Sequence, residues 1–163
     1  MTIADLNQMD RTAFIAAIGH VYENTPWVAG RAWHKRPFVS FDKLCDEMQA
    51  TVTDASHEEK LALLRAHPDL GTRARIGESS TREQVGAGLD RLSPEEYVEL
   101  ARMNAAYRLK FGFPFLYAVK GSGKQQILEA LETRLGSTPA DEFAEALKQV
   151  FRIAHFRLEE IVK

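Results

Sequence analysis

The segment "TPADEFAEALKQVFRIAHFRLEEI" (residues 138–161) decides the fold class, because it has the pattern of one long amphipathic helix. Thr138–Pro139 is typical of a helix start, since threonine caps the first turn and proline is tolerated at the first helical position. Apolar residues then recur three or four positions apart and form a continuous stripe. The stripe consists of Phe143, Leu147, Val150, Phe151, Ala154, Leu158 and Ile161. Such a helix has to bury its stripe against other elements.

Helix-start signals also recur through the rest of the chain. The expected capping positions are Asp10, Thr25–Pro26, Ser40, Ser56, Ser80, Ser93 and Ser122. The last four are each followed three residues later by Glu or Gln, which is the pattern of a capping box. Apolar residues at helical spacing follow most of these starts. We therefore expect an all-α fold, a single-domain bundle of seven to eight helices over residues 1–163.

One segment does not fit a helix: "FGFPFLYAV", residues 111–119, is apolar without a helical period and is interrupted by Pro114. A buried strand would need a partner strand, and the sequence offers no second candidate. We expect an extended, buried segment threaded between helices. Its backbone N–H and C=O groups would need partners other than a β-ladder, and a polar ligand is one source of them.

Composition excludes several classes of function. The 163 residues carry 21 Lys and Arg against 23 Asp and Glu, a formal charge of -2, so no basic field is present for a nucleic acid or an anionic membrane surface. No apolar run approaches the roughly 18 residues of a membrane span. The N-terminus has no signal-peptide pattern and Cys45 is the single cysteine, so we expect a cytoplasmic protein without disulfides.

The sequence contains neither a complete phosphate-binding loop nor a complete metal-binding pattern. The stretch Gly121–Lys124 resembles the end of a phosphate-binding loop, but Ala118 stands where the first glycine is needed. Gln125 also replaces the Ser or Thr that would hold magnesium. The five histidines contain no pair at helical ligand spacing, and one cysteine cannot complete a metal site. We therefore expect no metal and no phosphate-loop nucleotide site.

Three residues remain as candidates for chemistry. In "AHPDLG" (residues 66–71), Pro68 forces His67 out of the preceding helix, and a histidine with an unperturbed pKa near 6.5 suits proton transfer. Capping the helix carbonyls is an equally open role for His67. For Glu83, spacing alone favours the third position of a capping box. Arg157 lies at the border of the last helix's stripe, where it either extends to water or aims inward as a fork for a carboxylate or carbonyl.

Five blocks, taken together in order and spacing, resemble one family. They are "WVAGRAWHKRPF" (27–38), "AHPDLG" (66–71), "SSTREQVGAGLDRL" (79–92), "MNAAYRLKFGFPFLYAVKG" (103–121) and "RIAHFRLEEI" (152–161). The chain is similar over nearly its whole length to the OHCU decarboxylases, where OHCU is 2-oxo-4-hydroxy-4-carboxy-5-ureidoimidazoline. The resemblance implies decarboxylation of this ureidoimidazoline to (S)-allantoin, the last step of urate oxidation, by a homodimer that needs no cofactor or metal.

The resemblance also implies the site residues. His67 would be the catalytic acid or base, Glu83 an essential carboxylate and Arg157 the third catalytic group. Pro68 would form part of the substrate-binding wall. The remaining substrate-binding residues would be Ser80, Thr81, Arg82 and Gln84 with Phe115, Leu116, Tyr117, Ala118 and Val119, the last five through their backbone.

The substrate's chemistry agrees with a cofactor-free enzyme. Loss of CO2 leaves an electron pair, and the conjugated C=N of the imidazoline ring accepts it without pyridoxal or thiamine. Two alternatives stay open: a non-catalytic helical adaptor in which His67 and Glu83 are caps, and an enzyme acting on another ureido acid. His67→Asn or Glu83→Gln would leave an adaptor unchanged but inactivate a folded enzyme.

Overall fold

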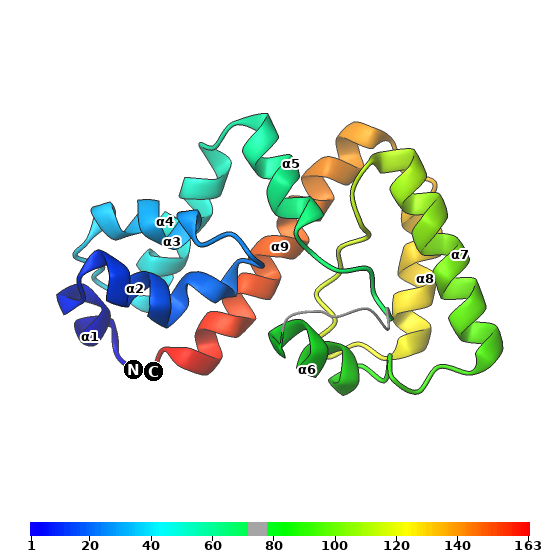
Figure 1. Ribbon diagram of the computed structural model, residues 1–163, viewed down its shortest axis with the longest axis horizontal. Helices are drawn as coiled ribbons and strands as arrows, with labels where there is room; N and C mark the ends of the chain where they lie inside the picture. The colour runs from blue at the N-terminus through cyan, green and yellow to red at the C-terminus, as the bar shows by residue number, and fades with distance from the viewer. Residues whose placement is uncertain (72–77) are drawn as a thin grey trace. The chain divides into compact units, whose positions relative to one another are not determined.

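The computed structural model describes residues 1–71 and 78–163, and these residues form nine α-helices, two short 3-10 helices and no β-strand. The all-α prediction is confirmed. The chain forms two compact units, which we call unit 1 (Met1–Ala66 with Phe151–Lys163) and unit 2 (His67–Val150). Figure 1 shows the helices of each unit in chain order.

Unit 1 contains the N-terminal helices. They are α1 (Ile3–Gln8), α2 (Arg11–Ile18), η1 (Gly19–Val21), α3 (Trp27–Ala32), η2 (Trp33–Lys35), α4 (Phe41–Thr53) and α5 (His57–Arg65), followed at the other end of the chain by the last part of α9 (Pro139–Ile161). Three predicted caps are confirmed, because the side chains of Asp10, Ser40 and Ser56 accept hydrogen bonds from the first turns of α2, α4 and α5. The predicted cap at Thr25–Pro26 is wrong: α3 has no side-chain cap, and the Thr25 hydroxyl donates to the Glu23 carbonyl.

The core of unit 1 follows the helical spacing of its apolar residues. Leu44, Met48 and Val52 lie four residues apart on α4 and are fully buried. Phe14 of α2 stacks on Phe38, with ring centroids 5.9 Å apart. The two chain ends lie next to each other, since the Lys163 N–H donates to the Met1 carbonyl at 2.8 Å (Figure 1).

Unit 2 contains α6 (Glu78–Gly86), α7 (Pro94–Phe111), α8 (Lys124–Arg134) and the first part of α9. Helix α7 begins as predicted, with a Ser93–Glu96 capping box and Pro94 in the first turn. It ends at Gly112, whose positive φ of 79° is the left-handed conformation that glycine adopts without strain.

The predicted buried extended segment is confirmed. Residues 114–119 have no helical structure, and all of residues 113–119 except Tyr117 are buried. An aromatic cluster anchors the start of the segment: the Tyr107 ring lies 5.9 Å from Phe113 and 5.4 Å from Phe115, centroid to centroid. Burying one such side chain contributes about 2–3 kcal/mol, which favours this path over an exposed loop.

The number of helices and the starts of α6 and α8 also differ from the predictions. Helix α1 was not expected, because it spans only six residues, although Thr2 and Asp5 form a capping box at its start. Helix α6 begins at Glu78, so Ser80 lies inside the helix and the predicted Ser80–Glu83 capping box is wrong. Glu83 therefore does not occupy the third position of a capping box, the role that spacing alone favoured for it.

The start of α8 is displaced by one residue. The cap is Gly123, whose N–H donates to the Gln126 side chain at 2.9 Å, in place of the predicted Ser122–Gln125 box. The Ser122 hydroxyl instead pairs with the Tyr117 hydroxyl at 3.0 Å. Because the Ser122 hydroxyl pairs with Tyr117 at the end of the extended segment, it does not cap α8.

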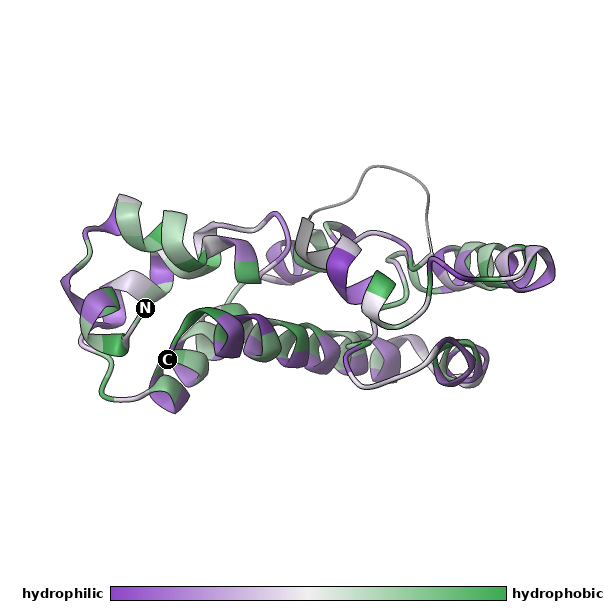
Figure 2. Ribbon diagram, turned by 90° about the horizontal axis from the view of Figure 1, so that it is seen from below, coloured by the Kyte–Doolittle hydropathy of each residue, from purple (hydrophilic) through white to green (hydrophobic). Residues whose placement is uncertain are grey.

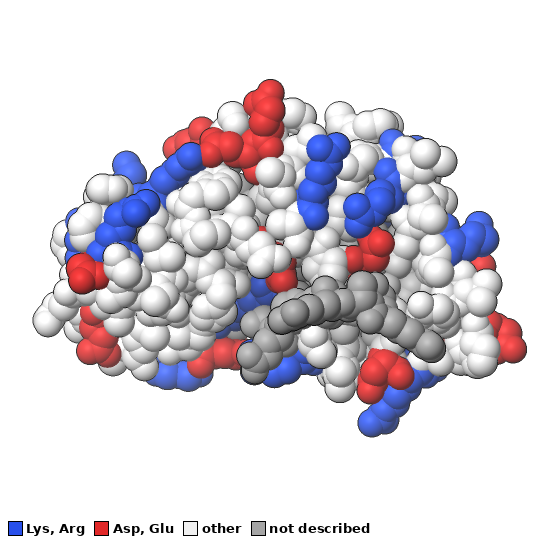
Figure 3. Space-filling model, viewed as in Figure 1, with Lys and Arg blue, Asp and Glu red and all other residues white. Residues whose placement is uncertain are grey.

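The distribution of hydropathy along α9 and of charge on the surface agrees with the sequence. Figure 2 shows α9 hydrophobic along one side and hydrophilic along the other, as its stripe predicts. On the face in Figure 3, basic and acidic side chains of the described residues are interspersed, which agrees with a net charge of -2. Within the described residues, no helix is both long and apolar enough to cross a membrane.

Candidate active site

His67 follows directly after the end of α5, as the proline at position 68 predicts. The helix ends at Arg65 with Ala66 as its cap, and His67 is the first residue of unit 2. Its side chain is only 6% exposed, so the imidazole is held inside the protein and does not lie on the surface. Burial beside a helix end holds the imidazole of His67 within the protein and restricts its movement.

The loop after Pro68 is held by side chains from α6 and α7. The Gly71 N–H donates to Gln84 Oε1 at 2.8 Å, and Asn104 Nδ2 donates to the Leu70 carbonyl at 2.9 Å. Gly71 has φ of +71°, and a Cβ there would lie 2.4 Å from Leu100 Cδ2, so this position requires glycine.

Asp69 also connects the loop after Pro68 to α7. Its carboxylate forms an ion pair with Arg108 of α7 at 2.9 Å. The backbone next to His67–Pro68 is therefore fixed to two helices, which limits how far the histidine can move.

Helix α6 presents the predicted Ser-x-x-Glu-Gln residues. Thr81 and Arg82 are exposed, Glu83 is half-buried, and Gln84 is 7% exposed. The side chain of Ser80 lies outside the described residues. Ser80 itself lies within the helix, one turn before Glu83 and Gln84.

Two buried polar atoms in this region lack a partner within the described residues: Gln84 Nε2, a donor, and Asn104 Oδ1, an acceptor. Because buried polar groups nearly always form hydrogen bonds, the Gln84 donor and the Asn104 acceptor are candidates for binding a polar ligand. Asn104 also borders a cleft of about 270 Å³. The cleft is lined by Asp69, Leu70, Gly71, Tyr97, Leu100, Ala101, Asn104, Ala105 and Arg108, and it includes neither His67 nor Glu83.

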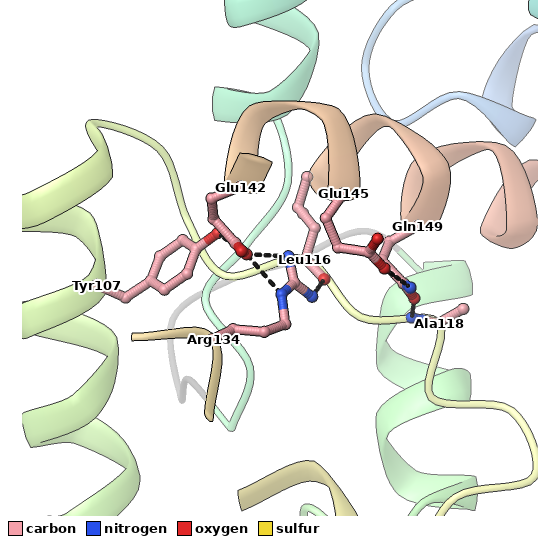
Figure 4. Close-up of polar contacts among 7 residues, drawn as sticks. All are labelled: Tyr107, Leu116, Ala118, Arg134, Glu142, Glu145 and Gln149. Carbon is pink, nitrogen blue, oxygen red and sulfur yellow. Dashed lines mark hydrogen bonds and ion pairs between the residues drawn. The ribbon is translucent and has the colours of Figure 1, made fainter. Parts of the chain in front are cut away.

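The extended segment obtains part of its backbone pairing from side chains. Arg134 of α8 donates to the Leu116 carbonyl, and Gln149 Oε1 accepts from the Ala118 N–H at 2.9 Å (Figure 4). The Val119 carbonyl accepts from the Ser122 N–H at 2.9 Å. The N–H groups of Leu116, Tyr117 and Val119 are not among the described hydrogen bonds, so they are candidate donors to a ligand.

A buried carboxylate supports this arrangement. Glu142 is 1% exposed; it accepts a 2.5 Å hydrogen bond from the Tyr107 hydroxyl and pairs with Arg134 (Figure 4). Burial, followed by the hydrogen bond to Glu142, raises the pKa of Tyr107, so its hydroxyl stays a donor. The Arg134 guanidinium also lies 4.5 Å from the centre of the Phe115 ring.

Sequence analysis missed Arg134, Glu142 and Gln149. A signal was present in the sequence, because Glu142 and Gln149 are seven residues apart and each directly precedes a residue of the apolar stripe. The structure shows that both are buried. Polar residues at core positions of a helix need dedicated partners, so they point to a specific contact.

Arg157 belongs to unit 1, where it aims inward and not toward solvent. It is 4% exposed, and its Nη1 lies 2.9 Å from Glu23 Oε2 and 3.3 Å from the Val21 carbonyl. Glu23 is 5% exposed, so the pair is buried. The inward alternative is therefore correct, and the carboxylate that Arg157 contacts is one of the protein's own.

The predicted residues fall into three described groups. The His67–Gly71 stretch and Gln84 are linked by hydrogen bonds, residues 115–119 are held by a second set of partners in unit 2, and Arg157 is in unit 1. Within residues 1–71 and 78–163, no group of three or more His, Cys, Asp or Glu side chains could hold a metal ion.

Comparisons with known proteins identify the family of the chain. The sequence model of the family OHCU decarboxylase matches residues 7–159. A 2-oxo-4-hydroxy-4-carboxy-5-ureidoimidazoline decarboxylase from Halalkalicoccus jeotgali is 48% identical over 161 residues, which cover 99% of this chain and 92% of that protein. The uric acid degradation bifunctional protein PucL of Bacillus subtilis is 43% identical, and the match covers 33% of its length.

Two solved structures have the same fold. A crystal structure of (S)-allantoin synthase superposes with a TM-score of 0.79 at 31% identity, covering 99% of this chain and 54% of that one. A crystal structure of OHCU decarboxylase in the presence of (S)-allantoin superposes with a TM-score of 0.72 at 20% identity, covering 93% and 97%. The family match over most of the chain shows that this protein belongs to the OHCU decarboxylase family.

Proposed function

We propose that this protein decarboxylates 2-oxo-4-hydroxy-4-carboxy-5-ureidoimidazoline to (S)-allantoin, the last step of urate oxidation. The observation that carries the proposal is the 48% identity, over 99% of the chain, to a decarboxylase of that name. The buried His67 and the unpaired donors of unit 2 support it, because a flat, carbonyl-rich ring needs both a proton-transfer group and N–H donors.

The reaction balances without a cofactor. The bond between C4 and its carboxylate breaks, CO2 leaves, and the bonding electron pair moves into the conjugated ring C=N, whose nitrogen takes up a proton. The resulting enol then loses the proton of its 4-hydroxyl to become a carbonyl, and the carbon that bears the ureido group gains one. Delivery of that proton to one face sets the S configuration.

His67 is the residue that we assign to these proton transfers. It would take the 4-hydroxyl proton as CO2 leaves or protonate the ring carbon from one side, and a positioned acid or base contributes about 10² to 10⁴ in rate. Pro68 would form the adjacent wall. An ionised Glu83 accepts hydrogen bonds only, so it suits the N–H groups of the ureido arm or ring.

N–H donors would bind the substrate carbonyls. The unpaired Nε2 of Gln84 and the backbone of residues 115–119 supply such donors in a buried setting, where hydrogen bonds to developing negative charge are strong. Ser80, Thr81 and Arg82 are the remaining α6 residues that we assign to substrate binding. Binding of the substrate by Arg157 stays a prediction, since its guanidinium is paired with Glu23.

We further propose that residues 1–163 act as one decarboxylase domain, in a cytoplasmic homodimer without cofactor, nucleic acid or membrane partner. The family match over residues 7–159, which spans both compact units, supports one functional domain. The net charge of -2, and the mixed signs of the described side chains on the face shown in Figure 3, support the absence of a nucleic acid partner.

Variants of the two polar candidates test the proposal. His67→Asn and Glu83→Gln should unfold like the wild type but release CO2 from the substrate at least about 10²-fold more slowly. His20→Asn is the matched control, because His20 is exposed, and it should keep full activity. Full activity of both site variants would refute the roles assigned to His67 and Glu83. A folded wild type without any turnover would support the adaptor alternative, and preferred turnover of other ureido acids would support the second alternative.

A further inference from the structure

Side chains from two helices form hydrogen bonds with the backbone of the extended segment, residues 114–119. Arg134 of α8 contacts the Leu116 carbonyl and Gln149 of α9 contacts the Ala118 N–H, two residues further along (Figure 4). Neither contact depends on the side chain of the segment residue. Arg134 and Gln149 therefore determine where the backbone runs, whatever side chains it carries.

The side chains of Arg134 and Gln149 are themselves oriented by acidic residues of α9. Gln149 Nε2 donates to Glu145 Oε1 at 2.9 Å, which leaves Oε1 as the atom that faces Ala118. Arg134 is held by the buried Glu142. Gln149 is 6% exposed, so water competes little for either of its hydrogen bonds.

The alternation of an extended chain separates the backbone groups of this segment into two sets. Successive residues of an extended chain present their N–H and C=O groups to opposite sides. The Leu116 carbonyl and the Ala118 N–H lie two residues apart and both face side chains of α8 and α9. The N–H groups of Tyr117 and Val119 then belong to the opposite side, and neither is among the described hydrogen bonds.

We propose that Arg134 and Gln149 are positioning residues, which hold the segment in the register that turns the N–H groups of Tyr117 and Val119 toward the substrate's carbonyl oxygens. The proposal rests on the proposed function, since it concerns the same reaction. Fixed donors of this kind need no reorganisation as charge develops on the substrate. A displacement of about 1 Å in such a group can cost about 10²-fold in rate.

Gln149 allows the sharper test, because its role divides into one acceptor and one donor. Gln149→Met removes both and keeps the side-chain length, and we expect kcat/KM to fall about 10- to 100-fold. In the double variant E145Q/Q149E, the new carboxylate accepts from Ala118 and the new amide donates to that carboxylate. We expect this double variant to recover most of the lost kcat/KM.

Gln125→Met is the matched control. Gln125 makes a similar pair with Glu129, from Nε2 to Oε1 at 3.2 Å, but it is exposed on α8. Its loss should leave kcat and KM unchanged. Equal loss of activity in Gln125→Met and Gln149→Met would overturn the positioning role.

Backbone amide NMR supplies a readout that a structural role alone would not change. On titration with (S)-allantoin, the amide resonances of Tyr117 and Val119 should move in the wild type, and that of Ala118 should move least because Gln149 already binds it. In Gln149→Met, exchange of the Ala118 amide should accelerate and the Tyr117 and Val119 shifts should weaken. A response centred on Ala118, or a folded Gln149→Met protein with wild-type kcat/KM, would overturn the proposal.

Failure of the proposed function gives a different result. A wild-type protein that neither turns over the substrate nor responds to allantoin refutes the function and the substrate-facing role together. Protection of the Ala118 amide by Gln149 would still be measured in the free protein. If the wild type is active and Gln149→Met has the same kcat/KM, the positioning role alone is refuted.

Discussion

The buried pair of Arg157 and Glu23 makes a strong stability prediction. The exposed fractions of Arg157 and Glu23 are 4% and 5%, and Arg157 Nη1 lies 2.9 Å from Glu23 Oε2, so each charge contributes to the compensation of the other. Removing one partner takes this compensation away from a buried charge, which costs about 3–5 kcal/mol. Arg157→Met and Glu23→Leu should therefore each lower the free energy of unfolding by roughly this amount.

The double variant distinguishes a coupled pair from two independent sites. With both charges replaced by apolar side chains, no charge is left unpaired, so R157M/E23L should lose much less stability than the sum of the single variants. We expect a coupling energy of about 3 kcal/mol or more.

Urea denaturation followed by tryptophan fluorescence is the suitable assay. The only two tryptophans, Trp27 and Trp33, both lie in unit 1 with the ion pair. Losses below about 1 kcal/mol, the size typical of exposed pairs, would refute the reasoning, as would strict additivity. If R157M/E23L regains stability but stays inactive, Arg157 has a role in the reaction beyond the pair.

Three further predictions concern titratable groups. Burial and the neighbouring Asp42 and Asp46 carboxylates raise the pKa of Cys45 to about 11, so at about pH 8.5 its alkylation should be on the order of a hundredfold slower than after unfolding; equal rates would contradict this. Burial raises the pKa of Tyr22 and Tyr107, so the near-ultraviolet absorbance of tyrosinate should lack these two groups until denaturant is added. Hydrogen bonds from Lys124 and the Ser93 N–H lower the pKa of Glu96 below 4.5, so its stabilising effect is present above pH 4.5 and is lost as the pH falls through the folded-state pKa. Glu96→Gln should therefore lose less stability than the wild type between about pH 5 and 3, and an identical acid profile would refute the assignment.

Most helices could be predicted because their start signals are local. Ser40, Ser56 and Ser93 cap helices within three residues of their own positions, so the pattern is complete in a short stretch of sequence. Helix α6 was misplaced because a Ser-x-x-Glu pattern occurs inside it, and local spacing cannot exclude an earlier start at Glu78. Helix α1 was missed because it has six residues and one buried side chain, Leu6.

The candidate site was predictable only in part, for a similar reason. Pro68 ends a helix by local sterics, so the place of His67 after α5 follows from two adjacent residues. The partners of residues 115–119 come from α8 and α9, and Glu23 reaches Arg157 from the other end of the chain. Such long-range contacts depend on tertiary packing, which no local pattern in a single sequence encodes.

Circular dichroism of the product tests the central claim most directly. The substrate is generated from urate with urate oxidase and 5-hydroxyisourate hydrolase, this protein is added, and the optical activity of the allantoin is followed. Uncatalysed breakdown gives racemic allantoin, so the account predicts faster substrate loss with a growing signal of the S enantiomer. An unchanged rate with an optically inactive product would contradict the assignment of this chain as a decarboxylase.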